Sequence, residues 1–216
     1  MPEPATAPLL LDYLEAYRLD NDLDAFQRRV EARYTQGTLC RLLRTGTPEA
    51  RRAAVLALGL TAKYDANEAV GEALKDRDPI VRNYATQALW AIWFRADTPE
   101  NNQALRLVKD LVQGDRPREA EQLATRLISR APKFAEAYNQ RAIARFAQGH
   151  YAESAADCRE VLQLNRYHIG ALGGLGQCYL RMGQREDALE TFRRALKLQP
   201  FNGDIRETIA VLEAGR

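Results

Sequence analysis

The chain has 216 residues, enough for one or two globular domains or for a single repeat array. Its hydrophobic share of 46% and its charged share of 28% are those of a folded protein and argue against disorder. A formal net charge of +2 gives no electrostatic reason to expect a nucleic-acid partner.

Targeting and redox signals are weak. The apolar run at residues 9–11 ends at Asp12, so we expect neither a signal peptide nor a membrane span. The three cysteines, Cys40, Cys158 and Cys178, have no ligand or disulfide spacing and are interpreted as small core residues. We expect a reduced, cytoplasmic protein.

Residues 1–36 carry two stripes of apolar residues at helical spacing. The stripes comprise Leu9, Leu10, Tyr13, Leu14 and Tyr17, then Leu23, Phe26, Val30 and Tyr34. We interpret them as two capping helices that follow a loose start. Asp20, Asp22 and Asp24 mimic the spacing of a calcium loop. Because Ala25 holds the place of the turn glycine, we favour helix capping.

Residues 37–97 contain a segment that recurs 31 residues later in the chain. The matched pairs are Pro48 with Pro79, Arg51 with Arg82, Ala54 with Ala85, and Leu58 with Leu89. In both copies a proline opens a helix and small residues allow close helix packing. The run from Asp78 to Leu89 resembles the short HEAT-like repeats of the phycobilisome-lyase type. This resemblance implies stacked helical hairpins.

Residues 98–202 repeat with a period of 34. Equal spacing relates Ala120, Ser154 and Ala188, and also Pro132, Arg166 and Pro200. The best unit, residues 169–202, carries Leu172, Gly176, Tyr179, Ala188, Phe192, Ala195 and Pro200. This pattern resembles the tetratricopeptide repeat and implies three units, the first of them degenerate. Ser154 and Arg166 depart from the usual Ala and Pro, so we expect a looser turn after the second unit. Residues 203–216 are expected to form a terminal capping helix.

The whole pattern predicts an all-α fold, a right-handed α-α superhelix (solenoid) of helix-turn-helix repeats. No strand-like alternation of apolar and polar residues occurs. Trp90 and Trp93 lie in an apolar run and are predicted to be buried where the two arrays join, without a flexible linker. The alternative is an exposed aromatic platform for RNA bases.

Reactive chemistry is not indicated. The glycine-rich run at residues 170–176 has no preceding strand, which a phosphate-binding loop needs. His150 and His168 are expected in turns, with neither a third metal ligand nor an orienting partner. We therefore expect no catalytic residue, no metal and no cofactor, and a protein that is not an enzyme.

The expected site is a concave groove. Tetratricopeptide arrays bind peptides or helices along the face made by the first helix of each unit, and the resemblance carries this role over. The residues expected to contact the partner are Arg106, Lys109, Asn139, Gln140, Ile143, Phe146, Gly173, Gly174, Gln177 and Arg181. The same register places Asn102, Leu105 and Glu136 on this face. The groove glycines admit either a partner's backbone or a neighbouring helix, and both interpretations stay open.

The expected partner is a peptide or helix of another protein, with neither nucleic acid nor membrane involved. Amide side chains would pair with its backbone, and Arg106, Lys109 and Arg181 would supply positive charge. The clamp with which some family members bind chaperone C-termini is not matched, because Leu105 and Lys109 replace its Lys and Asn. Two alternatives remain: an accessory subunit of an enzyme, as the likeness to bilin-lyase HEAT proteins suggests, and a homo-oligomerisation module.

Overall fold

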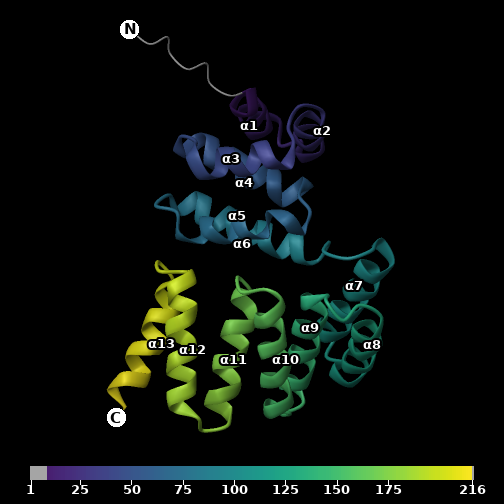
Figure 1. Ribbon diagram of the computed structural model, residues 1–216, viewed down its shortest axis with the longest axis vertical. Coiled ribbons are helices and arrows are strands. Elements are labelled where there is room, and N and C mark those ends of the chain that lie inside the picture. Colours follow the sequence, from purple (N-terminus) through teal and green to yellow (C-terminus); the bar gives the residue numbers. More distant parts are fainter. Residues whose placement is uncertain (1–8, 216) are drawn as a thin grey trace. The chain divides into compact units, whose positions relative to one another are not determined.

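The computed structural model describes residues 9–215 and consists of helices joined by short turns, without a strand in that range (Figure 1). The prediction of an all-α array of helical hairpins is confirmed. The chain divides into two compact units, Met1–Ile92 and Trp93–Arg216. None of the helices in the described range is long and apolar enough to cross a bilayer.

The first unit holds the two N-terminal helices and the HEAT-like segment. Its elements are α1 (Leu9–Asp20), α2 (Leu23–Arg33), α3 (Gln36–Thr45), α4 (Pro48–Thr61), the 3-10 turn Tyr64–Ala66, α5 (Asn67–Glu72), the 3-10 turn Ala73–Lys75 and α6 (Pro79–Trp93), which ends one residue past Ile92. The acidic segment before α2 is a helix cap, because the Asp22 carboxylate accepts a hydrogen bond from the Ala25 N–H at 2.8 Å.

The 31-residue recurrence corresponds to a repeated hydrogen bond. Arg51 donates to the carbonyl oxygen of Gly46 at 3.0 Å, and Arg82 donates to that of Arg77 at 3.0 Å. Each arginine thus satisfies a carbonyl of the turn that precedes its helix, five residues back. Such carbonyls have no partner inside a helix. The recurring arginine therefore ties each turn to the helix that follows it.

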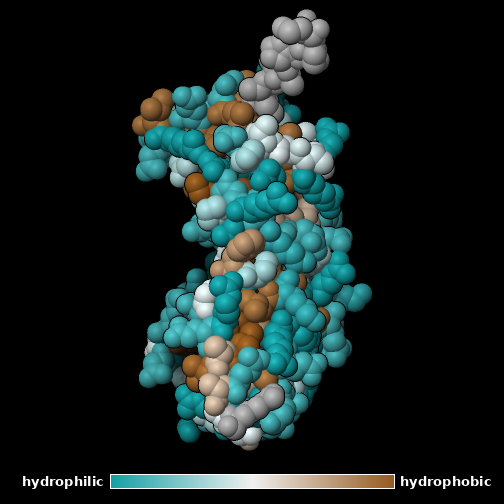
Figure 2. Space-filling model, turned by 90° about the vertical axis from the view of Figure 1, so that its left-hand side faces the viewer, coloured by the Kyte–Doolittle hydropathy of each residue, from teal (hydrophilic) through white to brown (hydrophobic). Residues whose placement is uncertain are grey.

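The second unit holds three helical hairpins and a final helix. Its elements are α7 (Pro99–Gln113), α8 (Pro117–Arg130), α9 (Ala135–Ala147), α10 (Tyr151–Leu164), α11 (Ile169–Arg181), α12 (Arg185–Leu198) and α13 (Gly203–Ala214). The hairpins α7/α8, α9/α10 and α11/α12 stand side by side, and α13 packs against α12 (Figure 1). On the side where α13 lies, Figure 2 shows an apolar band flanked by polar side chains. Phe201, just before α13, and Val211 on α13 are exposed apolar residues.

The 34-residue period is repeated in the turns between hairpins. The N–H groups of Phe134, His168 and Asn202 each bond the carbonyl three residues earlier, at 3.0, 3.1 and 3.0 Å. The expected looser turn after the second unit is therefore wrong. Ser154, at the usual alanine position, fits because its hydroxyl donates to the Ala142 carbonyl at 2.8 Å. Arg166, at the usual proline position, packs its guanidinium on the Tyr167 ring.

Turns inside the hairpins repeat in the same way. The N–H groups of Arg116, His150 and Gln184 each bond the carbonyl five residues earlier. The residue before each of them is left-handed: Asp115 has φ 54°, Gly149 80° and Gly183 74°. Such a turn ends a helix at a position that favours glycine. The degenerate first unit has kept the turn but not its glycine.

Candidate partner-binding surface

The predicted contact residues lie on the first helices of the three hairpins, α7, α9 and α11. These helices are neighbours, because α9 contacts both α7 and α11. The structure thus places the predicted residues on three neighbouring helices of the second unit. Their accessibility differs sharply, and two groups of side chains can be distinguished on α9 and α11.

The first group is accessible and forms what we call the open strip: Ile143, Phe146, Gly173, Gln177 and Arg181. Ile143 on α9 is 41% exposed, and Gln177 and Arg181 on α11 are exposed. The Arg181 guanidinium lies 5.8 Å from the centroid of the Phe146 ring, within the range of a cation–π interaction. A side chain placed at Gly173 would meet no heavy atom within 4 Å. The strip offers apolar surface, one guanidinium and a place for close backbone approach.

The second group is buried around a carboxylate. Glu136, Asn139 and Gln140 are 1%, 3% and 5% exposed. The Glu136 carboxylate accepts hydrogen bonds from the Asn139 amide at 2.9 Å, from the Gln140 amide at 2.8 Å and from the His168 ring at 2.8 Å. Because these amides are already bonded inside the unit, a partner cannot reach them in this structure. Asn139 and Gln140 are therefore left out of the proposed contact surface.

His168 has a defined tautomer in this cluster. Its Nδ1 accepts the backbone N–H of Ala171 at 3.0 Å, so the proton is assigned to Nε2, which donates to Glu136. The ring therefore caps α11 and holds Glu136 at the same time. His168 lies in a turn, as predicted, but no partner for it was predicted. The sequence held one indication of the pair: Glu136 lies on the predicted face, and His168 stands at the start of the next unit.

Trp93 covers this cluster. Its indole stacks on the His168 ring with centroids 4.1 Å apart and planes 16° from parallel, and Trp93 is 1% exposed. The RNA-platform alternative is thus excluded for Trp93. The following residue, Phe94, packs under Lys109, whose ammonium lies 5.3 Å from the ring centroid. The start of the second unit therefore occupies part of the face that was predicted to be an open groove.

The glycines of α11 have different neighbours. A Cβ on Gly174 would lie 3.3 Å from the Cys158 sulfur, whereas Gly173 faces open space. A Cβ on Gly176 would lie 2.6 Å from the Phe192 ring. Gly174 and Gly176 are thus explained by packing inside the unit. Of these three glycines, Gly173 alone retains the interpretation that a partner's backbone approaches closely.

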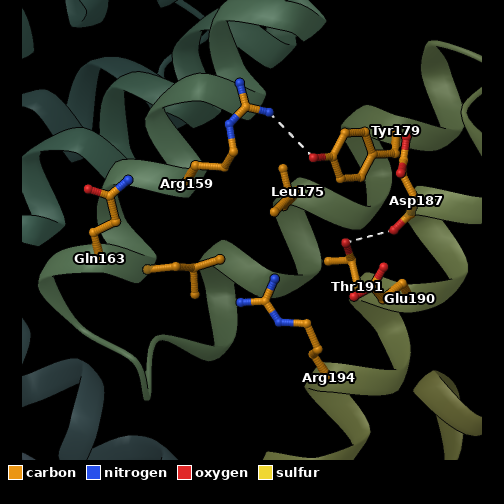
Figure 3. A pocket seen from close by; sticks show the side chains of 9 residues that line it. Arg159, Gln163, Leu175, Tyr179, Asp187, Glu190, Thr191 and Arg194 are labelled. Carbon is orange, nitrogen blue, oxygen red and sulfur yellow. Dashed lines mark hydrogen bonds between the residues drawn. The ribbon is translucent and has the colours of Figure 1, made fainter.

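A separate pocket of about 300 Å³ lies between α10, α11 and α12 (Figure 3). Arg159 donates to the Tyr179 hydroxyl at 3.4 Å on one side of it, and Arg194 points into it from α12. Asp187 and Glu190 line the same pocket, so its four charges cancel. No residue predicted to contact the partner lines it, and its balanced charge favours no ligand class.

Comparisons with known proteins assign the repeats. Two tetratricopeptide-repeat profiles match residues 105–169 and 145–212, and together they span half of the chain. A HEAT-repeat profile matches residues 37–129, so residues 105–129 match both kinds of repeat. A TPR repeat-containing protein of Rhizobium etli is 24% identical over 138 residues, which are 64% of this chain and 68% of that protein.

Other similar proteins match shorter stretches. FK506-binding protein 59 of Drosophila melanogaster is 42% identical over 50 residues, 23% of this chain and 11% of that protein. The first TPR of Spaghetti (RPAP3), solved with an HSP90 peptide, has a TM-score of 0.53 at 20% identity and covers 55% of this chain and 94% of its own. The Sgt2 TPR domain from Aspergillus fumigatus has a TM-score of 0.52 at 19% identity, covering 56% and 81%. The chain belongs to the tetratricopeptide-repeat family, with HEAT repeats in the part that precedes the tetratricopeptide units.

Proposed function

We propose that this chain is a non-catalytic protein-interaction scaffold that holds a peptide or helix of a partner protein against the open strip. The proposal is carried by one observation: an exposed Ile143 lies one turn before Phe146, whose ring pairs with Arg181, and Gly173, two turns before Arg181 on α11, faces open space. Apolar side chains of the partner would cover Ile143 and Phe146, and its backbone would approach Gly173. The solved tetratricopeptide domain bound to an HSP90 peptide supports this use of the fold.

The charges of the predicted contact residues favour an acidic partner segment. Arg106, Lys109 and Arg181 are exposed cations on α7 and α11, and the predicted contact residues include no carboxylate. Glu136, the acid that the repeat register places on that face, is buried and surrounded by three donors. Electrostatic complementarity would therefore select acidic segments and speed their association.

Peptide selection on the full chain tests the proposal. A random peptide library would be panned against the protein, and the selected peptides measured by fluorescence anisotropy. Gly173→Leu fills space that is open in the free protein, and Arg181→Glu reverses the charge of the strip. We expect each to weaken binding by roughly tenfold or more, which is about 1.4 kcal/mol.

Arg194→Glu is the matched control. This arginine is also exposed, has no ion-pair partner in the described range and lies on α12, away from the strip. Its reversal should leave affinity unchanged. Equal binding by wild type, Gly173→Leu and Arg181→Glu would refute the strip as the contact surface. Peptide-independent self-association in light scattering would favour a second copy of the chain as the occupant.

We also propose that the chain works in a reducing compartment, the cytoplasm. All three cysteines are free thiols in the structure. Disulfides are rare where glutathione and thioredoxin keep thiols reduced.

A further inference from the structure

Two thiols meet in the core between the second and third tetratricopeptide units. Cys158 on α10 is 2% exposed and Cys178 on α11 is 0% exposed, and both belong to one apolar cluster. The sequence predicted small core residues at both positions. Their surroundings in the structure indicate more than that.

Each sulfur lies against the helix that carries the other. The Cys178 thiol donates to the Ser154 hydroxyl at 3.2 Å, and Ser154 is one turn before Cys158 on α10. Reciprocally, the Cys158 sulfur lies 3.3 Å from the Cβ position of Gly174, one turn before Cys178 on α11. Two independent contacts thus place both sulfurs in the same gap between the same pair of helices.

The two thiols are also unequal. The neighbouring Cys158 thiol lowers the pKa of Cys178, while the Cys178 thiol, with burial second, raises the pKa of Cys158. The Cys178 sulfur is therefore the one that ionises first. Thiolates react with peroxides and thiols do not, so Cys178 is the nucleophile of the pair.

We propose that Cys158 and Cys178 form an oxidative modification site, at which a hydroperoxide converts the two thiols into a disulfide that joins α10 to α11. The Cys178 thiolate attacks the peroxide, the O–O bond breaks, and an alcohol or water leaves with one proton. The Cys178 sulfenic acid is then attacked by the Cys158 sulfur, the S–O bond breaks, and water leaves. Two thiols and one hydroperoxide thus give one disulfide, one alcohol or water, and one water.

Gly174 is the point at which a small oxidant would enter. It is partly exposed, and a Cβ placed on it would meet the Cys158 sulfur at 3.3 Å, so a small local opening at Gly174 would admit the oxidant to the buried pair. Cys40 provides an internal comparison in the same chain. It is half-buried on α3, and burial raises its pKa, so it lacks the activation that Cys178 has.

Peroxide treatment of the full chain tests the proposal. The reduced protein would be exposed to hydrogen peroxide, denatured, alkylated with iodoacetamide and digested without reduction for mass spectrometry. We expect two of the three thiols to disappear together, a linked peptide pair that contains Cys158 and Cys178, and a Cys40 that remains alkylated. Dithiothreitol should restore both thiols.

Variants separate this outcome from nonspecific oxidation. Cys40→Ala should leave the linkage unchanged, and Cys158→Ser should abolish it and leave Cys178 as sulfenic or sulfinic acid. If the wild-type protein keeps both thiols at a peroxide dose that fully oxidises glutathione, the proposal is overturned. This result does not depend on whether the variants fold. Linkage of either residue to Cys40 would overturn the proposal as well. The result is independent of partner binding.

Discussion

His168 donates its Nε2 hydrogen to the Glu136 carboxylate at 2.8 Å, and both side chains are fully shielded from solvent. This contact joins the start of the third hairpin to the first helix of the second. It also decides which part of the inner face is available to a partner. The buried cluster holds the hairpins together, and the strip beyond it remains free.

Removing His168 should destabilise the protein strongly. His168→Ala leaves the buried Glu136 carboxylate one donor short and removes the cap of α11, with an expected loss of about 3 kcal/mol or more. Urea unfolding followed by circular dichroism measures the loss. His150→Ala is the matched control, because His150 also precedes a helix but is exposed and makes no side-chain cap bond. Equal effects of the two substitutions would contradict the role given to His168.

Two glycines of α11 should respond oppositely to alanine. Gly173→Ala meets open space in a helix and should stabilise the protein by about 0.5–1 kcal/mol. Gly176→Ala drives a methyl into the buried Phe192 ring and should destabilise it by about 1–3 kcal/mol. Thermal unfolding of the two variants checks the signs. A stabilising Gly176→Ala would show that the close approach to Phe192 is not a constraint.

Asp115 occupies the left-handed turn position that Gly149 and Gly183 hold in the other two hairpins. Asp115→Gly should therefore raise the free energy of unfolding by about 1 kcal/mol. Asp110→Gly, at an exposed helical position in the last turn of α7, should give no such gain, because glycine is no better a helix former than aspartate. Chemical denaturation compares them, and a loss of stability on Asp115→Gly would contradict the turn assignment.

Asp78 should contribute to the loss of folding stability at low pH. Burial alone would raise the pKa of this carboxyl, but hydrogen bonds from Arg52 and from the Ile80 N–H outweigh it and hold the pKa below its ordinary value. Because the pKa is lower in the folded state than in the unfolded state, the ionised carboxylate stabilises the fold at pH values above the unfolded-state pKa. This stabilisation is lost below about pH 4, as the pH falls through the folded-state pKa. Asp78→Asn should remove that part of the acid dependence while costing stability at pH 7. Urea midpoints at pH 7 and pH 3 test this, and unchanged pH dependence in the variant would contradict it.

The repeat periods predicted a great deal of this structure. A 34-residue spacing sufficed to align the hairpins and to identify Gly176 as a close-packing position, because these are local properties of a helical hairpin. It also led to a wrong expectation at Arg166. The turn there is set by backbone hydrogen bonds that do not need proline.

Burial on the inner face could not be predicted in the same way. Asn139 and Gln140 have the polarity and register of groove residues, and nothing near them in the sequence shows that Glu136 accepts both amides. The covering residue, Trp93, is far from His168 in the chain and lies outside the repeat pattern. The repeat period assigns each residue to a face of its helix. Whether other residues of the chain cover that face depends on contacts between segments that are distant in the sequence.

Nuclear magnetic resonance offers the most direct test of the open strip as the partner-binding surface. The full chain, labelled at isoleucine methyl and backbone amide groups, would be titrated with a selected acidic peptide. We predict shift changes at Ile143, Gly173, Gln177 and Arg181, with Arg159 and Arg194 of the other pocket unaffected. Changes confined to that pocket or to the first unit, with the strip unperturbed, would contradict the account.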